Sequence, residues 1–158
     1  MVPIIKGIDH VVITVTNIFR SCRWYENMLG MKVETFISPS DPNKKRYALI
    51  LNDQKINLHE IGMKVNPMAK CPQPGSVDLC FWTDQPVSSI LKHWQQQIQK
   101  LKDDSNDELL KNIEGPLLLE NNQHIVQRTG ARGLLKSIYI YDPDGNLIEV
   151  SNRSTPSI

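Results

Sequence analysis

Cysteine is scarce in this sequence, which contains three among 158 residues. Cys22, Cys71 and Cys80 lie far apart, and no two of them form a Cys-x-x-Cys spacing. An odd number of separated cysteines argues against a disulfide framework and against a cysteine-rich zinc site. The first residues also contain no basic segment followed by an apolar one, so no export signal is visible. We therefore expect a cytoplasmic protein.

Long apolar runs and an excess of one charge are also missing. The longest apolar stretches, such as residues 11–15, are far shorter than the ~18 residues of a membrane span. Eighteen Lys and Arg against seventeen Asp and Glu give a formal net charge of +1. No basic run exceeds the Lys44-Lys45-Arg46 triplet. Neither nucleic acid nor a membrane is therefore expected as a partner.

The composition is that of an ordinary globular protein. Hydrophobic residues make up 40% of the chain and charged residues 22%, a balance that disordered chains lack. A length of 158 residues is near the commonest domain size. We expect a single domain over residues 1–158.

The first half of the chain predicts the order β-α-β-β-β. The β-branched segment 8–15 is typical of a strand and is interrupted by the polar His10. A helix follows, with Asn17 as its N-cap and Gly30 as its stop. Three extended segments come next, at 31–37, 46–52 and 55–60, separated by a loop and by a tight turn at Asp53 and Gln54.

The second half predicts the same order again. A linker rich in proline and glycine spans 63–75, and an apolar stripe from Val87 to Leu101 indicates a helix. An acidic insertion is expected near 102–112, and a turn at 142–146. The predicted strands are 77–83, 117–119, 125–128, 134–141 and 147–151. The predicted fold class is α+β, with two β-α-β-β-β modules, at 4–62 and 76–153, that pair into a cupped mixed sheet with the helices outside.

The two halves align over two pairs of strand segments, 8–13 with 76–81 and 56–59 with 148–151. In this alignment His10 corresponds to Asp78, and Asn57 corresponds to Glu149. Strand alternation points these side chains away from the residues that pack under the helices. We therefore expect His10, Asp78 and Glu149 to meet on concave sheet faces, together with Asn57 or His59.

These residues form a nitrogen and oxygen ligand set. The predicted metal ligands are His10, Asp78, Glu149 and His59, which suit a divalent metal ion such as Zn²⁺, Ni²⁺, Mn²⁺ or Fe²⁺. Such an ion could polarise a carbonyl while Glu149 or Asp78 serves as the catalytic base. The same residues also allow a structural interpretation, in which His10 pairs with Asp78 in the core and His59 only bonds a strand end.

Four further residues are predicted to contact a substrate. Arg128 and Arg132 flank a Thr-Gly pair and could hold a carboxylate or phosphate from a loop, although a solvated loop is an equal alternative. Trp82 points to the face opposite Phe81 and could line the pocket, and Asn57 is the fourth candidate. Cys80 shares a strand face with Asp78 but has no neighbouring base, so no thiolate nucleophile is predicted.

Motifs over almost the whole chain resemble the vicinal oxygen chelate superfamily, which contains glyoxalases, bleomycin-resistance proteins and extradiol dioxygenases. Residues 9–15 resemble its opening strand, and Asp142-Pro143-Asp144-Gly145-Asn146-Leu147-Ile148-Glu149 resembles its final hairpin. More narrowly, four segments resemble the glyoxalase domain-containing protein 5 subgroup and its bacterial virulence-associated relatives. These segments are 55–60, 74–81, 128–131 and 137–139.

The resemblance implies a divalent metal enzyme of the lyase/isomerase or dioxygenase type that acts on a small oxygenated substrate. His10 matches the first-strand ligand, and Glu149 matches the last-strand ligand. Two positions depart from the pattern: Asn57 stands where glyoxalase I has a second Glu, and Asp78 where many members have a second His. Because Asn cannot take a proton, we predict a poor glyoxalase I. The alternative is a non-catalytic protein that binds a small molecule, as bleomycin-resistance proteins do, and a homodimer is kept open.

Overall fold

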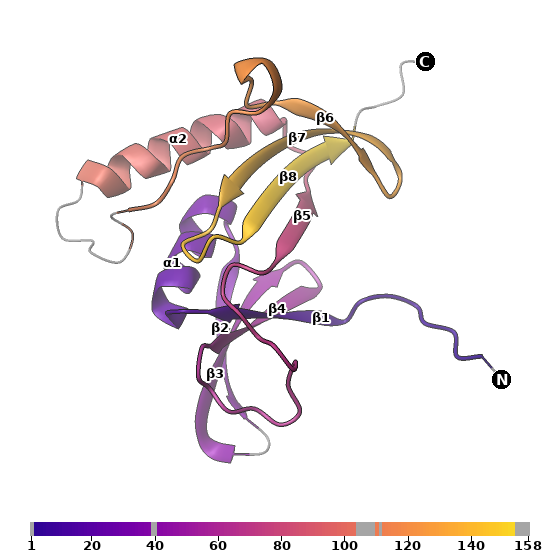
Figure 1. The fold of residues 1–158 in the computed structure, drawn as a ribbon, viewed down its shortest axis with the longest axis vertical. Helices are drawn as coiled ribbons and strands as arrows, with labels where there is room; N and C mark the ends of the chain where they lie inside the picture. Colours follow the sequence, from indigo (N-terminus) through magenta and orange to yellow (C-terminus); the bar gives the residue numbers. More distant parts are fainter. Residues whose placement is uncertain (1, 39–40, 104–109, 111, 154–158) are drawn as a thin grey trace. The chain divides into compact units, whose positions relative to one another are not determined.

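The computed structural model describes residues 2–38, 41–103, 110 and 112–153. The chain divides into two compact units, Met1–Pro74 and Gly75–Ile158. Each unit contains a four-stranded mixed sheet and one α-helix among its described residues (Figure 1). The predicted α+β fold built from two β-α-β-β-β modules is thus confirmed. No helix in the described part of the chain combines the length and the apolar character that crossing a membrane requires.

Unit 1 contains β1 (His10–Val15), α1 (Ile18–Leu29), β2 (Lys32–Ser38), β3 (Asp41–Leu51) and β4 (Gln54–Glu60). The sheet order is β1-β4-β3-β2, with β1 parallel to β4 and the other neighbours antiparallel. Strand β3 begins five residues before the predicted start at Arg46. It does so because the antiparallel pairing with β2 continues from Arg46 to the far end, where Asp41 pairs with Ser38.

Helix α1 has the predicted ends. The Asn17 side chain accepts a hydrogen bond from the Arg20 amide over 2.9 Å, as an N-cap does. Gly30 adopts φ 65°, and its amide donates to the Glu26 carbonyl over 3.0 Å. The helix packs on β2, β3 and β4 and buries Trp24 and Tyr25 completely.

Unit 2 contains β5 (Asp78–Trp82), α2 (Val87–Asp103), a short 3₁₀ helix η1 (Glu120–Asn122), β6 (Val126–Gly130), β7 (Gly133–Tyr141) and β8 (Leu147–Arg153). The sheet order is β5-β8-β7-β6, with β5 parallel to β8. Helix α2 packs on β7 and β8 (Figure 1). Within the predicted acidic insertion, residues 102–103 end α2, while 104–109 and 111 lie outside the described residues.

The predicted strand at 117–119 is wrong. Leu117 donates one hydrogen bond to the Tyr139 carbonyl over 2.9 Å, but the chain then turns instead of continuing along β7. The turn is closed by the Leu119 amide, which donates to the Gln123 carbonyl over 2.9 Å. Leu117, Leu118 and Leu119 thus lie at the start of a turn and do not pair as a strand.

The predicted turn at 142–146 anchors the entry to β5. The buried Asp142 carboxylate accepts hydrogen bonds from the Asn146 amide over 2.8 Å and from the Asn146 side chain over 2.8 Å. The Asn146 side-chain oxygen in turn accepts from the Val77 amide over 3.1 Å. These bonds hold the start of β5 beside the β7–β8 hairpin.

Strand register confirms the internal repeat. In unit 1, Val12 on β1 pairs with Asn57 on β4, and in unit 2, Cys80 on β5 pairs with Glu149 on β8. Both pairs join parallel strands. Asn57 and Glu149, which the sequence alignment matched, therefore occupy equivalent positions in the two sheets.

Candidate functional site

The polar residues of β8 share one face of the unit 2 sheet. Glu149, Ser151 and Arg153 alternate with Ile148 and Val150, which are buried in the core. Because successive strand residues point to opposite faces, the three polar side chains lie on the side away from that core. This polar face is where the sequence predicted functional residues.

The register brings partners from neighbouring strands to this face. Glu149 lies between Cys80 of β5 and Tyr139 of β7, and Ser151 lies opposite Ser137 of β7. A hollow of about 460 Å³ opens over this part of the sheet. We call it the Glu149 hollow, and its lining residues are Cys80, Trp82, Arg128, Thr129, Gly130, Ala131, Arg132, Leu135, Tyr139, Glu149 and Arg153.

Four of the predicted site residues meet in the Glu149 hollow: Glu149, Arg128, Arg132 and Trp82. Trp82 is 59% exposed and therefore presents its ring to the hollow and to solvent. Asp78 is not among the lining residues. It lies at the exposed start of β5, opposite Leu147.

A buried hydrogen-bond network holds the Glu149 carboxylate. Ser151 Oγ donates to Glu149 Oε1 over 2.9 Å, and Ser151 is fully buried. Ser137 Oγ lies 2.8 Å and Cys80 Sγ 3.4 Å from Ser151 Oγ. A hydroxyl has one proton and two lone pairs, so with its proton committed to Glu149, Ser151 accepts from both neighbours. The half-buried carboxylate is thereby fixed at one oxygen.

Tyr139 and Arg128 complete the surroundings of Glu149. Burial raises the pKa of Tyr139, and the Glu149 carboxylate raises it further through its charge and by accepting a hydrogen bond. Arg128 lowers the pKa of Tyr139. The Arg128 guanidinium lies 5.7 Å from the centroid of the Tyr139 ring. The phenol therefore stays protonated and serves as a hydrogen-bond donor beside the carboxylate.

The thiol of Cys80 also stays protonated. Its partial burial raises its pKa, and the charge of Glu149 adds to that effect. A thiol with a raised pKa is a poor nucleophile. The contact that the structure gives Cys80 is its hydrogen bond with Ser151.

In unit 1 the equivalent face carries Asn57 and His59 on β4. Asn57 Oδ1 is buried and has no hydrogen-bond partner among the described residues. Burial lowers the pKa of His59, and the positive charge of Arg46 lowers it further. An unpaired buried carbonyl oxygen is costly, so Asn57 offers an acceptor for a donor group that the described residues do not supply.

His10 lies at the beginning of β1 with its side chain 46% exposed. Its Nδ1 atom lies 2.7 Å from Asp9 Oδ1, and the Asp9 side chain is 97% exposed. Within unit 1, the observed partner of His10 is therefore a surface carboxylate.

The predicted donors suit a divalent ion by type, but they divide between the two units. Unit 1 supplies His10 and His59, and unit 2 supplies Asp78 and Glu149. No three His, Cys, Asp or Glu side chains gather as a metal-binding group within residues 2–38, 41–103, 110 and 112–153. Within either unit taken by itself, the described residues do not provide a complete ligand set.

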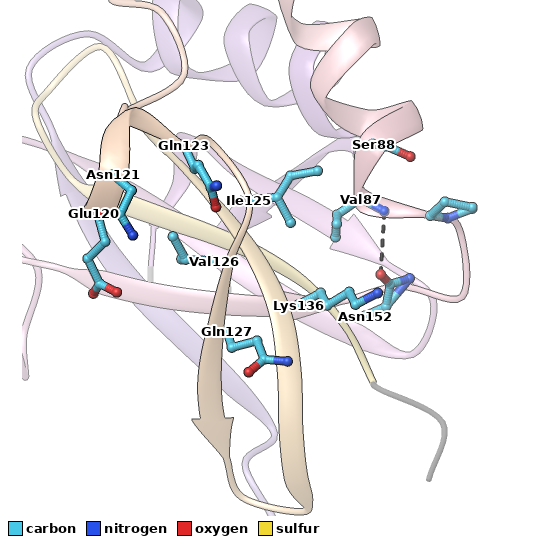
Figure 2. Close-up of a pocket in the computed structure, with 11 residues that line it drawn as sticks. Val87, Ser88, Glu120, Asn121, Gln123, Ile125, Val126, Gln127, Lys136 and Asn152 are labelled. Carbon is cyan, nitrogen blue, oxygen red and sulfur yellow. Dashed lines mark hydrogen bonds between the residues drawn. The ribbon is translucent and has the colours of Figure 1, made fainter. Parts of the chain in front are cut away.

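A second hollow, of about 490 Å³, lies on the other face of the same sheet, beside the start of α2 (Figure 2). None of the predicted site residues lines this hollow. Its Asn152 side chain accepts a hydrogen bond from the Val87 amide over 3.4 Å and donates to the Gln85 carbonyl over 2.6 Å. Because this amide connects β8 to the beginning of α2, Asn152 has a structural role.

Comparisons with known proteins identify the family. A model described as the Glyoxalase/Bleomycin resistance protein/Dioxygenase superfamily matches residues 7–74. Virulence protein STM3117 of Salmonella typhimurium is 42% identical over 148 residues, which are 94% of this chain and 85% of that protein. Glyoxalase domain-containing protein RDO1 of Mycosarcoma maydis is 37% identical over 148 residues, 94% of this chain and 69% of that protein. This chain belongs to the glyoxalase superfamily.

Solved structures extend the likeness to both modules. The protein VPC_CASS1, from the mobile metagenome of V. pseudocholerae, has a TM-score of 0.76 and 37% identity, covering 98% of this chain and 100% of that one. The crystal structure of STM3117 has a TM-score of 0.73 and 38% identity, covering 96% and 100%. The glyoxalase superfamily fold thus includes unit 2, which the family model does not reach.

Sequence reasoning missed four residues of this glyoxalase superfamily site: Tyr139, Ser137, Ser151 and Arg153. Ser151 and Arg153 follow Glu149 at two-residue spacing, so strand alternation alone could have placed them on its face. Tyr139 and Ser137 could not be found in this way, because their positions depend on the register between β7 and β8.

Proposed function

We propose that this glyoxalase superfamily member is an enzyme that moves a proton on a small oxygenated substrate, with Glu149 as the base. The observation that carries the proposal is the fixed carboxylate that lines the Glu149 hollow. A general base must be held within hydrogen-bond reach of the proton that it abstracts. Ser151 holds one oxygen of Glu149 in place before any substrate arrives.

The neighbouring groups have matching roles in this proposal. A carboxylate has about four lone-pair sites, so Glu149 can accept from Ser151 and Tyr139 and still accept a proton from a substrate. The Tyr139 hydroxyl, from the residue opposite Glu149 on β7, can donate a hydrogen bond to a substrate oxygen. A hollow of about 460 Å³ is within the usual range for small-molecule sites.

Proton exchange with solvent tests the proposal directly. Small 2-oxo acids, 2-hydroxy acids and their phosphate esters are incubated with the protein in D₂O, and loss of each C–H signal is followed by proton NMR. At least one compound should exchange, and Glu149→Gln should slow that exchange by about 10²–10⁴-fold, the usual share of a general base. Lys136→Met, in the hollow of Figure 2, is the control and should leave the rate unchanged. Equal rates in wild type and Glu149→Gln would contradict the proposal.

Metal dependence is a separate part of the proposal. The ion, if the protein takes one, would be Zn²⁺, Ni²⁺, Mn²⁺ or Fe²⁺, and His10 and Glu149 are its predicted ligands. Metal analysis of protein purified without chelators, followed by Mn²⁺ titration, tests this. His10→Ala and Glu149→Ala should each weaken Mn²⁺ binding at least tenfold. Unchanged Mn²⁺ affinity in both variants would contradict the proposed metal site. The proposed proton transfer would then still be tested by the exchange experiment.

Efficient glyoxalase I activity is not part of this function. Asn57, at the place equivalent to Glu149, cannot accept a proton. Freshly formed methylglyoxal–glutathione hemithioacetal with Zn²⁺, Ni²⁺ or Mn²⁺ should therefore give little or no turnover. Asn57→Glu is the variant expected to gain activity, and wild-type turnover of about 1–10³ s⁻¹ would contradict this expectation.

The second candidate function is small-molecule binding without chemistry, and the neutral Asn57 supports it. Under this alternative a ligand saturates the wild type and Glu149→Gln alike, and neither protein promotes exchange.

We also propose three further properties of this protein: closeness to the glyoxalase domain-containing protein 5 subgroup, a cytoplasmic location and a homodimer.

A further inference from the structure

Arg153, which ends β8, is held against an exposed aromatic ring. Its guanidinium carbon lies 4.8 Å from the centroid of the Trp82 ring, and both residues line the Glu149 hollow. A guanidinium stacked on an indole keeps its N–H groups directed outward in its own plane. The stacking therefore restricts Arg153 while leaving its donors free for a planar oxyanion.

A second arginine lies in the same cross-strand row. Arg128 on β6 pairs with Leu135 on β7, and Leu135 pairs with Arg153 on β8. The row therefore has one arginine on each side of Leu135, all three residues line the hollow, and Arg132 lines it from the β6–β7 turn. In the structure the two outer guanidinium groups lie over different strands, since Arg153 lies over Trp82 of β5 and Arg128 lies over Tyr139 of β7, so they mark two sides of the hollow.

The charges of the hollow are unbalanced. Its lining residues include three arginines and one carboxylate, that of Glu149, so the formal sum is three positive charges minus one negative charge. Arg128 also lies 3.2 Å from Glu120 Oε1, but the Glu120 side chain is 72% exposed, so solvent screens this pair. Unbalanced guanidinium groups in a hollow attract an anion.

We infer that Arg153, positioned by Trp82, binds an oxyanion in a hollow made positive by Arg128 and Arg132, so that the substrate carries a carboxylate or phosphate group. The inference rests on the proposed function for the site of the reaction. Arg153 lies four residues along β8 from Glu149, which is about 13 Å of strand. The oxyanion is thus an anchor at one end of the hollow, and the reacting carbon lies near Glu149 at the other.

Anion binding is measured without any turnover. Trp82 is 59% exposed, whereas Trp24 and Trp94 are fully buried, so a change in tryptophan fluorescence on ligand binding reports Trp82. Inorganic phosphate, malonate and acetate are titrated separately, with glycerol as the neutral probe. Phosphate, malonate or both should bind, and glycerol should not. Preference between phosphate and malonate distinguishes the two kinds of oxyanion.

Variants then assign the binding to Arg153. Arg153→Met should weaken anion binding at least tenfold by calorimetry, and Arg153→Lys, which keeps the charge but loses the planar fork, should weaken it less. Trp82→Ala should weaken it as Arg153→Lys does, because the unstacked guanidinium is no longer restricted. Lys136→Met removes an exposed positive charge from the other face of the sheet and should have no effect.

Two outcomes would overturn the inference. One is the absence of phosphate and malonate binding by the folded wild type. The other is an equal loss in Arg153→Met and Lys136→Met, which would indicate unspecific attraction. Failure of the proposed proton transfer can be distinguished from failure of this inference. Glu149→Gln should keep its anion binding even if no compound exchanges a proton in any variant.

Discussion

Ser151 donates a hydrogen bond of 2.9 Å to Glu149 from the same face of the same strand. Ser151 is fully buried, whereas Glu149 is half-buried at the hollow. The pair therefore joins a buried hydroxyl to the carboxylate that lines the candidate site. Ser137 and Cys80, both hydrogen-bonded to Ser151, extend this connection to β7 and β5.

Replacing Ser151 with Ala should destabilise the protein by about 1–3 kcal/mol, because the change leaves buried polar groups without their partner. Glu149 loses a donor, and Ser137 and Cys80 lose an acceptor. The free energy of unfolding is measured by urea denaturation. Ser89→Ala, on the exposed side of α2, is the control and should change it by less than about 0.5 kcal/mol. A similarly small change in Ser151→Ala would contradict the network.

The phenol of Tyr139 should ionise above its ordinary pKa of 10.0, chiefly because it is buried. The unfolded chain then loses the proton first, so stability should fall as pH rises above about 10. Glu149→Gln should lower the pKa of Tyr139, since the negative charge beside the phenol is removed. NMR titration of ¹³C-labelled tyrosine measures the pKa. Glu120→Gln removes a more distant carboxylate as the control, and an unchanged Tyr139 pKa in Glu149→Gln would refute the contact.

The imidazole of His59 should titrate below its ordinary pKa of 6.5, first because of burial and second because of Arg46. The unfolded chain then binds the proton more readily, so this contribution to stability is present above about pH 6.5 and is lost as pH falls. Arg46→Met should raise the pKa of His59, as measured by NMR. Lys44→Met removes an exposed charge from the same strand and should leave it unchanged. A shift of equal size in both variants would show that Arg46 has no special effect.

Replacing Gly75 with Ala should destabilise unit 2 at the turn that anchors β5. Gly75 has φ 72°, and an added Cβ would lie 2.6 Å from the Asp144 carbonyl oxygen. Gly62→Ala is a matched control, since Gly62 has φ 82° but open space around the added atom. The control should cost about 1 kcal/mol for backbone strain, and Gly75→Ala should cost more because the clash adds to it. Equal losses in thermal or urea unfolding would rule out the close approach.

Local features were predictable because they depend on a few neighbouring residues. Asn17 and Gly30 end α1 as expected, since an N-cap side chain and a left-handed glycine act within one turn. The alternation of Glu149 with buried residues was equally visible. The wrong predictions concern pairing between strands. Strand β3 is five residues longer at its start than predicted because it pairs with β2 there, and residues 117–119 turn away from β7.

The sequence by itself determined the repeated β-α-β-β-β order, the two caps of α1 and the sheet face on which Glu149 lies. Only the tertiary structure decided that Tyr139 and Cys80 flank this carboxylate and that Arg153 stacks on Trp82. The physical reason is that alternation fixes the face on which a side chain lies, whereas its neighbours are fixed by cross-strand register. In unit 2 that register follows from the turn at 142–146 and from the Asn146 bond to Val77, which align three strands at once.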